Sequence, residues 1–93
     1  MQQTEQFIQA IADYFDQSVA TATDDQLFAA GYLRGHVDLA VGTLQVAAEA
    51  FSNTQLIELV EQSLVRAIDG GELNSADEAL VRQIWTTLQQ LAV

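Results

Sequence analysis

The residues of this chain that could do chemistry are few, and the most unusual set of them lies within residues 24–40. This segment holds the only histidine, His36, and also Arg34, one of only three cationic side chains in 93 residues. An arginine can bind an anion, and a histidine can move a proton near neutral pH. The two residues therefore define one candidate site, for a small anionic ligand or for acid–base catalysis.

Helical geometry argues against a local Arg34–His36 pair. Residues two apart on a helix point in nearly opposite directions, so the two side chains would reach one ligand only if the helix broke nearby. Arg34 is instead predicted to pair with Asp38, four residues later. His36 shares a face with Tyr32 and is predicted to be hydrogen-bonded at the rim of the core, with partner contact and catalysis as alternative roles.

Two glycines interrupt the same segment, Gly31 and Gly35. A glycine inside a helix costs about 1 kcal/mol relative to alanine, so this pair needs a structural reason. Small residues four apart let another backbone approach closely, and Gly42 falls on the same face. We expect this face to pack against another helix of the chain, or otherwise against a partner. The resulting candidate interaction surface consists of Tyr32, Arg34, Gly35 and His36.

Two carboxylate pairs, Asp13 with Asp16 and Glu58 with Glu61, have the three-residue spacing that places both groups on one helix face. Such pairs can hold magnesium. Each pair, however, lies away from the apolar stripe of its own helix, so we predict that both face solvent. No metal or other cofactor is expected.

The composition restricts the partners. Thirteen acidic residues against three arginines give a net charge of −10, and neither lysine nor cysteine is present. Nucleic acids and anionic membranes both need a basic surface, so neither is expected as a partner. An acidic surface favours a protein with a basic surface, and a homodimer is a further candidate. No leader peptide or membrane span is recognisable, so a cytoplasmic location is expected.

Apolar residues recur at helical spacing in four segments, near residues 4–21, 24–50, 53–69 and 76–92. Thr4 is a candidate N-cap, and capping boxes begin at Thr23, Ser52 and Ser75. The chain is therefore predicted to be all-α, a compact antiparallel four-helix bundle with a long second helix, forming one domain over residues 1–93. The predicted core consists of Phe7, Ile11, Phe15, Leu33, Val37, Leu44, Val60, Leu64, Ile84 and Leu88.

The second helix is apolar over most of its circumference. Phe28, Leu39 and Val46 form a second apolar strip in addition to the face that contributes to the core. Such a pattern indicates either a central helix or a helix that contacts a second chain. A helix spanning 24–50 would also be longer than its neighbours, so it must bend, break at a glycine, or extend past them.

The segment from Asp24 to His36, Asp-Asp-Gln-Leu-Phe-Ala-Ala-Gly-Tyr-Leu-Arg-Gly-His, resembles the signature of the YfcL-like family of small uncharacterised bacterial proteins. The second half resembles this family too, at Gln62-Ser63-Leu64, Gly71-Glu72-Leu73, Ala79-Leu80-Val81 and Trp85. The resemblance implies a bacterial, cytoplasmic protein and supplies no substrate or catalytic residue. We expect a non-enzymatic protein that binds a macromolecular partner. The alternative is an anion-binding protein or enzyme that uses Arg34 and His36.

Overall fold

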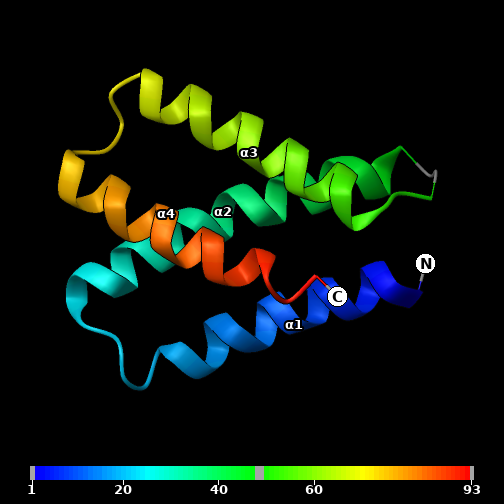
Figure 1. Cartoon of the computed structure of the whole chain (residues 1–93), viewed down its shortest axis with the longest axis horizontal. Helices are drawn as coiled ribbons and strands as arrows, with labels where there is room; N and C mark the ends of the chain where they lie inside the picture. Colours follow the sequence, from blue (N-terminus) through cyan, green and yellow to red (C-terminus); the bar gives the residue numbers. More distant parts are fainter. Residues whose placement is uncertain (1, 48–49, 93) are drawn as a thin grey trace.

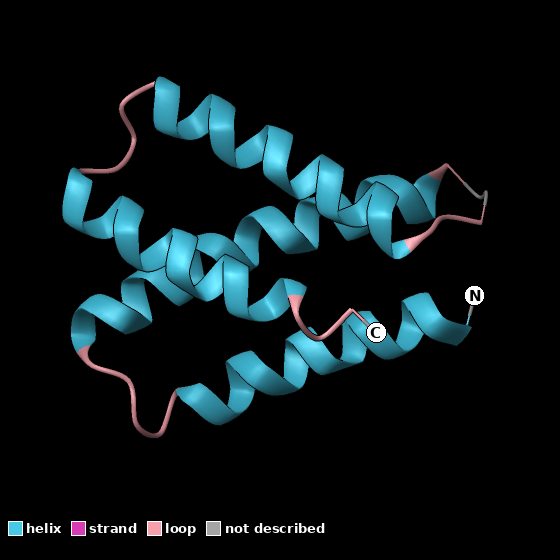
Figure 2. Cartoon of the chain, in the orientation of Figure 1, coloured by secondary structure: helices cyan, strands magenta, loops and turns pink. Residues whose placement is uncertain are grey.

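The computed structural model describes residues 2–47 and 50–92, and four helices account for most of them (Figures 1 and 2). The helices are α1 (Gln2–Ser18), α2 (Asp24–Val46), α3 (Asn53–Asp69) and α4 (Ser75–Gln89). Short connections join them, and each helix runs roughly opposite to the one before it. No strand occurs in these described ranges. The all-α bundle predicted from the sequence is confirmed.

Side-chain capping explains where three of the helices begin. Thr23 and Ser52 form the predicted capping boxes at the starts of α2 and α3. The predicted N-cap of α4, Ser75, is wrong by one residue, because the N-cap is Asn74. The Asn74 side chain accepts a hydrogen bond from the backbone N–H of Asp77. Each cap satisfies a backbone donor that has no partner within its own helix.

Thr4 is not an N-cap, because α1 begins before it. The Thr4 side chain is buried, and its hydroxyl donates a hydrogen bond to the backbone carbonyl of Phe51 at 3.0 Å. This bond ties α1 to the connection between α2 and α3. A threonine already inside a helix can use its hydroxyl for a distant acceptor, which the sequence pattern alone does not reveal.

The end of α3 turns sharply at two glycines. Gly71 has a φ of +80°, in the left-handed region that glycine adopts readily. Its N–H donates to the carbonyl of Ile68, and the N–H of Glu72 donates to the carbonyl of Ala67. This pair of bonds is the Schellman motif, which closes a helix C-terminus. The motif also fixes the position of Glu72, whose side chain contacts α2.

Helix α2 lies at the centre of the packing and contacts both α3 and α4. It continues through Gly31, Gly35 and Gly42 without a break, and its 23 residues match the 36 Å length of the molecule at about 1.5 Å per residue. The predicted extension to residue 50 was too long, because α2 ends at Val46. Residues 48–49 lie outside the described ranges.

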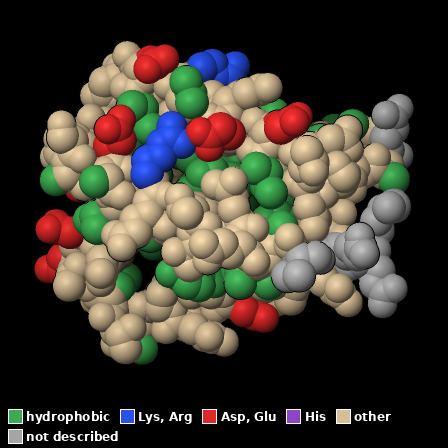
Figure 3. All heavy atoms as spheres, in the orientation of Figure 1, with side chains coloured by type: hydrophobic (Ala, Val, Ile, Leu, Met, Phe, Trp, Pro, Cys, Tyr) green, Lys and Arg blue, Asp and Glu red, His purple; other side chains and the backbone are tan. Residues whose placement is uncertain are grey.

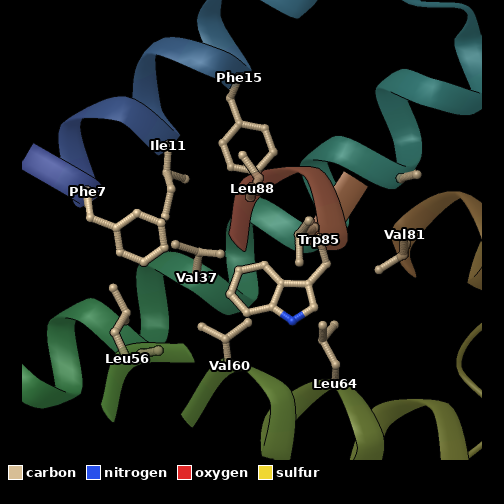
Figure 4. Packing of buried hydrophobic residues seen from close by; sticks show 13 residues of the cluster. Phe7, Ile11, Phe15, Val37, Leu56, Val60, Leu64, Val81, Trp85 and Leu88 are labelled. Atoms are coloured by element: carbon tan, nitrogen blue, oxygen red, sulfur yellow. The ribbon is translucent and has the colours of Figure 1, made fainter. Parts of the chain in front are cut away.

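The core is one cluster to which all four helices contribute (Figure 4). Eight of the ten predicted core residues are buried there, whereas Leu44 and Ile84 are half-buried and pack at its edge. Trp85 was not predicted, yet it is among the largest buried side chains and is only 1% exposed. Two small residues of α2, Ala29 and Ala40, are also fully enclosed.

The first prediction concerns Leu64, which is fully buried on α3. Leu64→Ala should lower the free energy of unfolding by about 2–5 kcal/mol, because it removes buried methyl groups and leaves a cavity. Val46→Ala is the matched control, since Val46 is 86% exposed and its truncation should change little. Denaturant unfolding of both variants measures the difference. A loss below about 0.5 kcal/mol for Leu64→Ala would contradict this core.

Candidate functional site

The outward side of α2 carries large apolar side chains that nothing in the described chain covers. Phe28, Leu39 and Val46 are 52%, 67% and 86% exposed. At about 100° per residue, the 18 residues from Phe28 to Val46 complete five turns, and Leu39 falls within about 20° of the same direction. With Gly31, Gly35 and Gly42, these residues form one face, named here the outer α2 face.

The glycines of the outer α2 face do not contact another backbone. A Cβ atom added to Gly31, Gly35 or Gly42 would meet no heavy atom within 4 Å outside its own helical backbone. The predicted packing against another helix of the chain is therefore wrong. Three neighbouring helices cover only one side of α2, and the glycines lie on the other side. Their lack of side chains leaves shallow gaps between the exposed apolar groups.

An aromatic ladder borders this face, built from residues four apart on α2. The rings of Phe28 and Tyr32 are stacked with centroids 6.2 Å apart, and those of Tyr32 and His36 are 4.8 Å apart. Side chains at this spacing lie above one another on a helix. Tyr32 and His36 are half-buried, so the ladder joins the exposed face to the packed side of the helix.

Tyr32 is anchored by an acidic partner from the turn after α3. Its hydroxyl donates a hydrogen bond to Oε1 of Glu72 at 2.7 Å. Burial of the phenol, the hydrogen bond to Glu72 and the charge of that carboxylate together raise the pKa of Tyr32 from 10.0 to about 12, with burial the largest cause. All three effects favour the neutral phenol. Tyr32 therefore stays protonated and holds the turn against α2.

His36 lies at the rim of the core, as predicted, with its ring turned toward α3. Its Nδ1 is 2.5 Å from the hydroxyl oxygen of Ser63, and both residues line a small cleft of about 210 Å³. A serine–histidine pair can serve in nucleophilic catalysis when a third group orients the histidine. No carboxylate is bonded to His36 among the described residues, so the pair joins α2 to α3 without forming a triad.

Arg34 points the other way, toward α1. Its guanidinium forms an ion pair with Asp16 at 3.2 Å and lies 5.5 Å from the centre of the Phe15 ring. The predicted pair with Asp38 does not form, because α1 offers Arg34 both a carboxylate and an aromatic face. Arg34 and His36 line separate clefts, one against α1 and one against α3. The single anion site predicted on both residues is thus not assembled.

One predicted carboxylate pair is exposed to solvent, and one member of the other pair contacts a neighbouring helix. Asp13 and Asp16 are exposed, as predicted, and Asp16 holds Arg34. Glu61 corrects the prediction, since it is half-buried and faces α4. Its Oε1 accepts from Arg82 at 2.5 Å, and its Oε2 accepts from the indole Nε1 of Trp85 at 2.8 Å. Over the described residues, no three potential metal ligands gather in one place.

Comparisons with known proteins identify the family of this chain. The sequence model described as "YfcL protein" matches residues 5–90, which is nearly the whole chain. The chain belongs to the YfcL family. One relative in this family, the "Uncharacterized protein YfcL" of Escherichia coli (strain K12), is 42% identical over 87 residues, covering 94% of both chains. No solved structure matches.

The described part of this YfcL family member has no helix with the length and apolar character that crossing a membrane requires. Its four candidate residues all lie on α2. The structure brings Tyr32, Gly35 and His36 to one side of α2 and turns Arg34 to the other. It adds Phe28, Leu39 and Val46, whose apolar strip was visible in the sequence although its exposure was not.

The second prediction concerns the glycines. Because no neighbour would clash with an added methyl group, Gly31→Ala and Gly35→Ala should each stabilise the protein by up to about 1 kcal/mol through helix propensity. Thermal unfolding measures the change. Gly71→Ala is the contrasting control and should destabilise, because its φ is +80°. A lower melting temperature for both helix variants would indicate a covered outer α2 face.

The third prediction concerns pH. Since the folded-state pKa of Tyr32 lies above the unfolded value, the stability that this group contributes is complete below pH 10.0 and is lost as the pH rises through about 12. An absorbance titration of the phenolate should show this late step. Tyr32→Phe should remove it, and Glu72→Gln should lower its midpoint. An unchanged midpoint in Glu72→Gln would contradict the contact.

Proposed function

We propose that this protein is a non-enzymatic cytoplasmic binding protein whose outer α2 face docks a basic amphipathic helix of another protein. The observation that carries the proposal is the exposure of Phe28, Leu39 and Val46 on one face of a continuous helix. A contiguous exposed apolar surface bordered by polar residues is typical of an interaction site. An amphipathic helix fits a narrow apolar strip through anchors three, four and seven residues apart.

The glycines support a helical partner. Gly31, Gly35 and Gly42 leave room between the exposed apolar side chains. Helix axes can approach closely where small residues line a contact, and anchors on the incoming helix can then fill the gaps. Tyr32 and His36 border the same surface and supply rings whose edges a partner can contact.

Charge selects a basic partner over a second copy of this chain. The chain has a net charge of −10, and Asp24, Asp25 and Asp38 are exposed on α2 beside the apolar strip. Bringing two such chains together would place like charges side by side. Basic residues flanking the apolar side of a partner helix would instead meet these carboxylates, which also speeds encounter.

The same charge argument disfavours nucleic acid and anionic membrane as partners, because both carry negative charge. A catalytic role is disfavoured by geometry. Arg34 is already paired with Asp16, and His36 is bonded to Ser63 in a different cleft. The Arg34 and His36 side chains thus join α2 to α1 and to α3.

The fourth prediction tests this proposal with Leu39→Asn, which removes an apolar anchor without adding charge. Affinity for a cellular partner should fall roughly tenfold, corresponding to about 1.5 kcal/mol of lost apolar burial. Val19→Asn is the matched control, because Val19 is 59% exposed beyond the end of α1. A photo-crosslinking residue at Leu39, followed by mass spectrometry, identifies the partner and its contact segment.

Three outcomes decide the proposal. It is supported if the crosslinked segment is a basic amphipathic helix whose binding weakens in Leu39→Asn and at high salt, but not in Val19→Asn. Equal capture by wild type and Leu39→Asn would reject the outer α2 face as the site. A dimer in sedimentation analysis that dissociates in Leu39→Asn would replace the basic partner by a second copy.

A further inference from the structure

A second surface, distinct from the outer α2 face, lies between α3 and α4. It is an open groove of about 790 Å³, within the usual range for small-molecule sites. Ile57, Val65 and Trp85 supply its apolar lining, and Glu61, Arg66 and Arg82 supply polar groups. The face in Figure 3 shows cationic and acidic side chains together with exposed hydrophobic atoms.

The groove collects two of the three arginines of the chain. The third, Arg34, lies on the α1 side of the molecule and is paired with Asp16. The chain has a net charge of −10, so most of its surface repels anions. The two arginines reduce that repulsion at the groove. The Arg66 side chain makes no hydrogen bond or ion pair with any other residue in the described ranges. Its guanidinium is therefore available to a ligand.

Glu61 organises the other arginine. One oxygen of Glu61 accepts from Nη1 of Arg82, and the other accepts from the indole Nε1 of Trp85. Both carboxylate oxygens are engaged, so Arg82 and the indole are held in fixed orientations at the groove. The remaining N–H groups of Arg82 stay available, because a guanidinium has five donors.

The two arginines lie toward the same end of the groove. Arg66 is in the last turn of α3, and Arg82, at the middle of α4, is the first residue of that helix to line the groove. The two helices are antiparallel and joined by a short turn, so both arginines lie nearer that turn than the other groove residues of their helices (Figure 1). Ile57 lies at the opposite end, near the start of α3. The acidic Glu58 lines that far end too and is separated from Arg66 by two helical turns.

The geometry points to a binding site for a small amphipathic anion. A carboxylate, or a group of similar charge and shape, would bind Arg66 and Arg82, and an apolar body would lie along Val65 and Ile57, above the buried Trp85. Arginine matches the planar geometry of a carboxylate. This inference does not depend on the proposed function, because the groove and the outer α2 face share no residue.

The test uses octanoate as the probe and its neutral analogue octanamide as the matched ligand. Trp85 is the only tryptophan, so its fluorescence and its indole N–H signal in NMR spectra report on the groove directly. Octanoate should shift the indole signal and the backbone signals of groove residues in a saturable manner. Octanamide should bind at least about tenfold more weakly, as expected for loss of a charge-assisted hydrogen bond.

Arg66→Gln is the decisive variant, because the Arg66 guanidinium has no hydrogen bond or ion pair with the described residues whose loss would disturb the fold. It should weaken octanoate binding about tenfold and leave thermal unfolding unchanged. Arg34→Gln is the matched control and should leave octanoate affinity unchanged. The inference is overturned by equal binding of octanamide, by equal weakening in both variants, by shifts confined to the outer α2 face, or by no saturable shift.

Discussion

The structure depends on the burial of one side of α2. Leu33 and Val37 are almost fully enclosed there, and the flanking Ala29 and Ala40 are buried as well. Small buried residues let neighbouring helices come close, so α3 and α4 can both pack on α2. Phe28, Leu39 and Val46, on the opposite side of α2, are not covered by the other three helices. The outward side of α2 therefore stays exposed as a consequence of the packing that forms the core.

Polar contacts then fix how the helices are placed around α2. Arg34 joins α2 to α1, His36 joins α2 to α3, and Tyr32 joins α2 to the turn after α3. Glu61 joins α3 to α4 through Arg82 and Trp85. Each contact is directional, whereas apolar burial is not. These directional contacts are consistent with only some of the arrangements that would bury the same apolar area, although the exposed ion pair of Arg34 contributes at most about 1 kcal/mol.

Two surfaces of different chemistry result from this packing. The outer α2 face is apolar, narrow and bordered by exposed carboxylates, which suits a basic helix. The α3–α4 groove contains two arginines beside apolar side chains, which suits a small anion. Because they lie on different helices, the two surfaces can be occupied independently. Occupation of the groove would change the surroundings of Trp85 without touching Phe28 or Leu39.

The sequence by itself determined the helices and most of the core. The capping boxes at Thr23 and Ser52 and the glycine turn after α3 are local, because they depend on residues within one turn of each other. Periodicity identified Phe7, Ile11 and the other stripe residues for the same reason.

Only the tertiary structure decided which side of α2 would be open. Gly31 and Gly35 looked like contact residues, and the packed small residues are instead Ala29 and Ala40. Likewise, Arg34 pairs with Asp16, which is 18 residues away in the sequence, and Glu61 pairs with Arg82, which is 21 residues away. Such partners depend on how the helices cross, which periodicity does not specify.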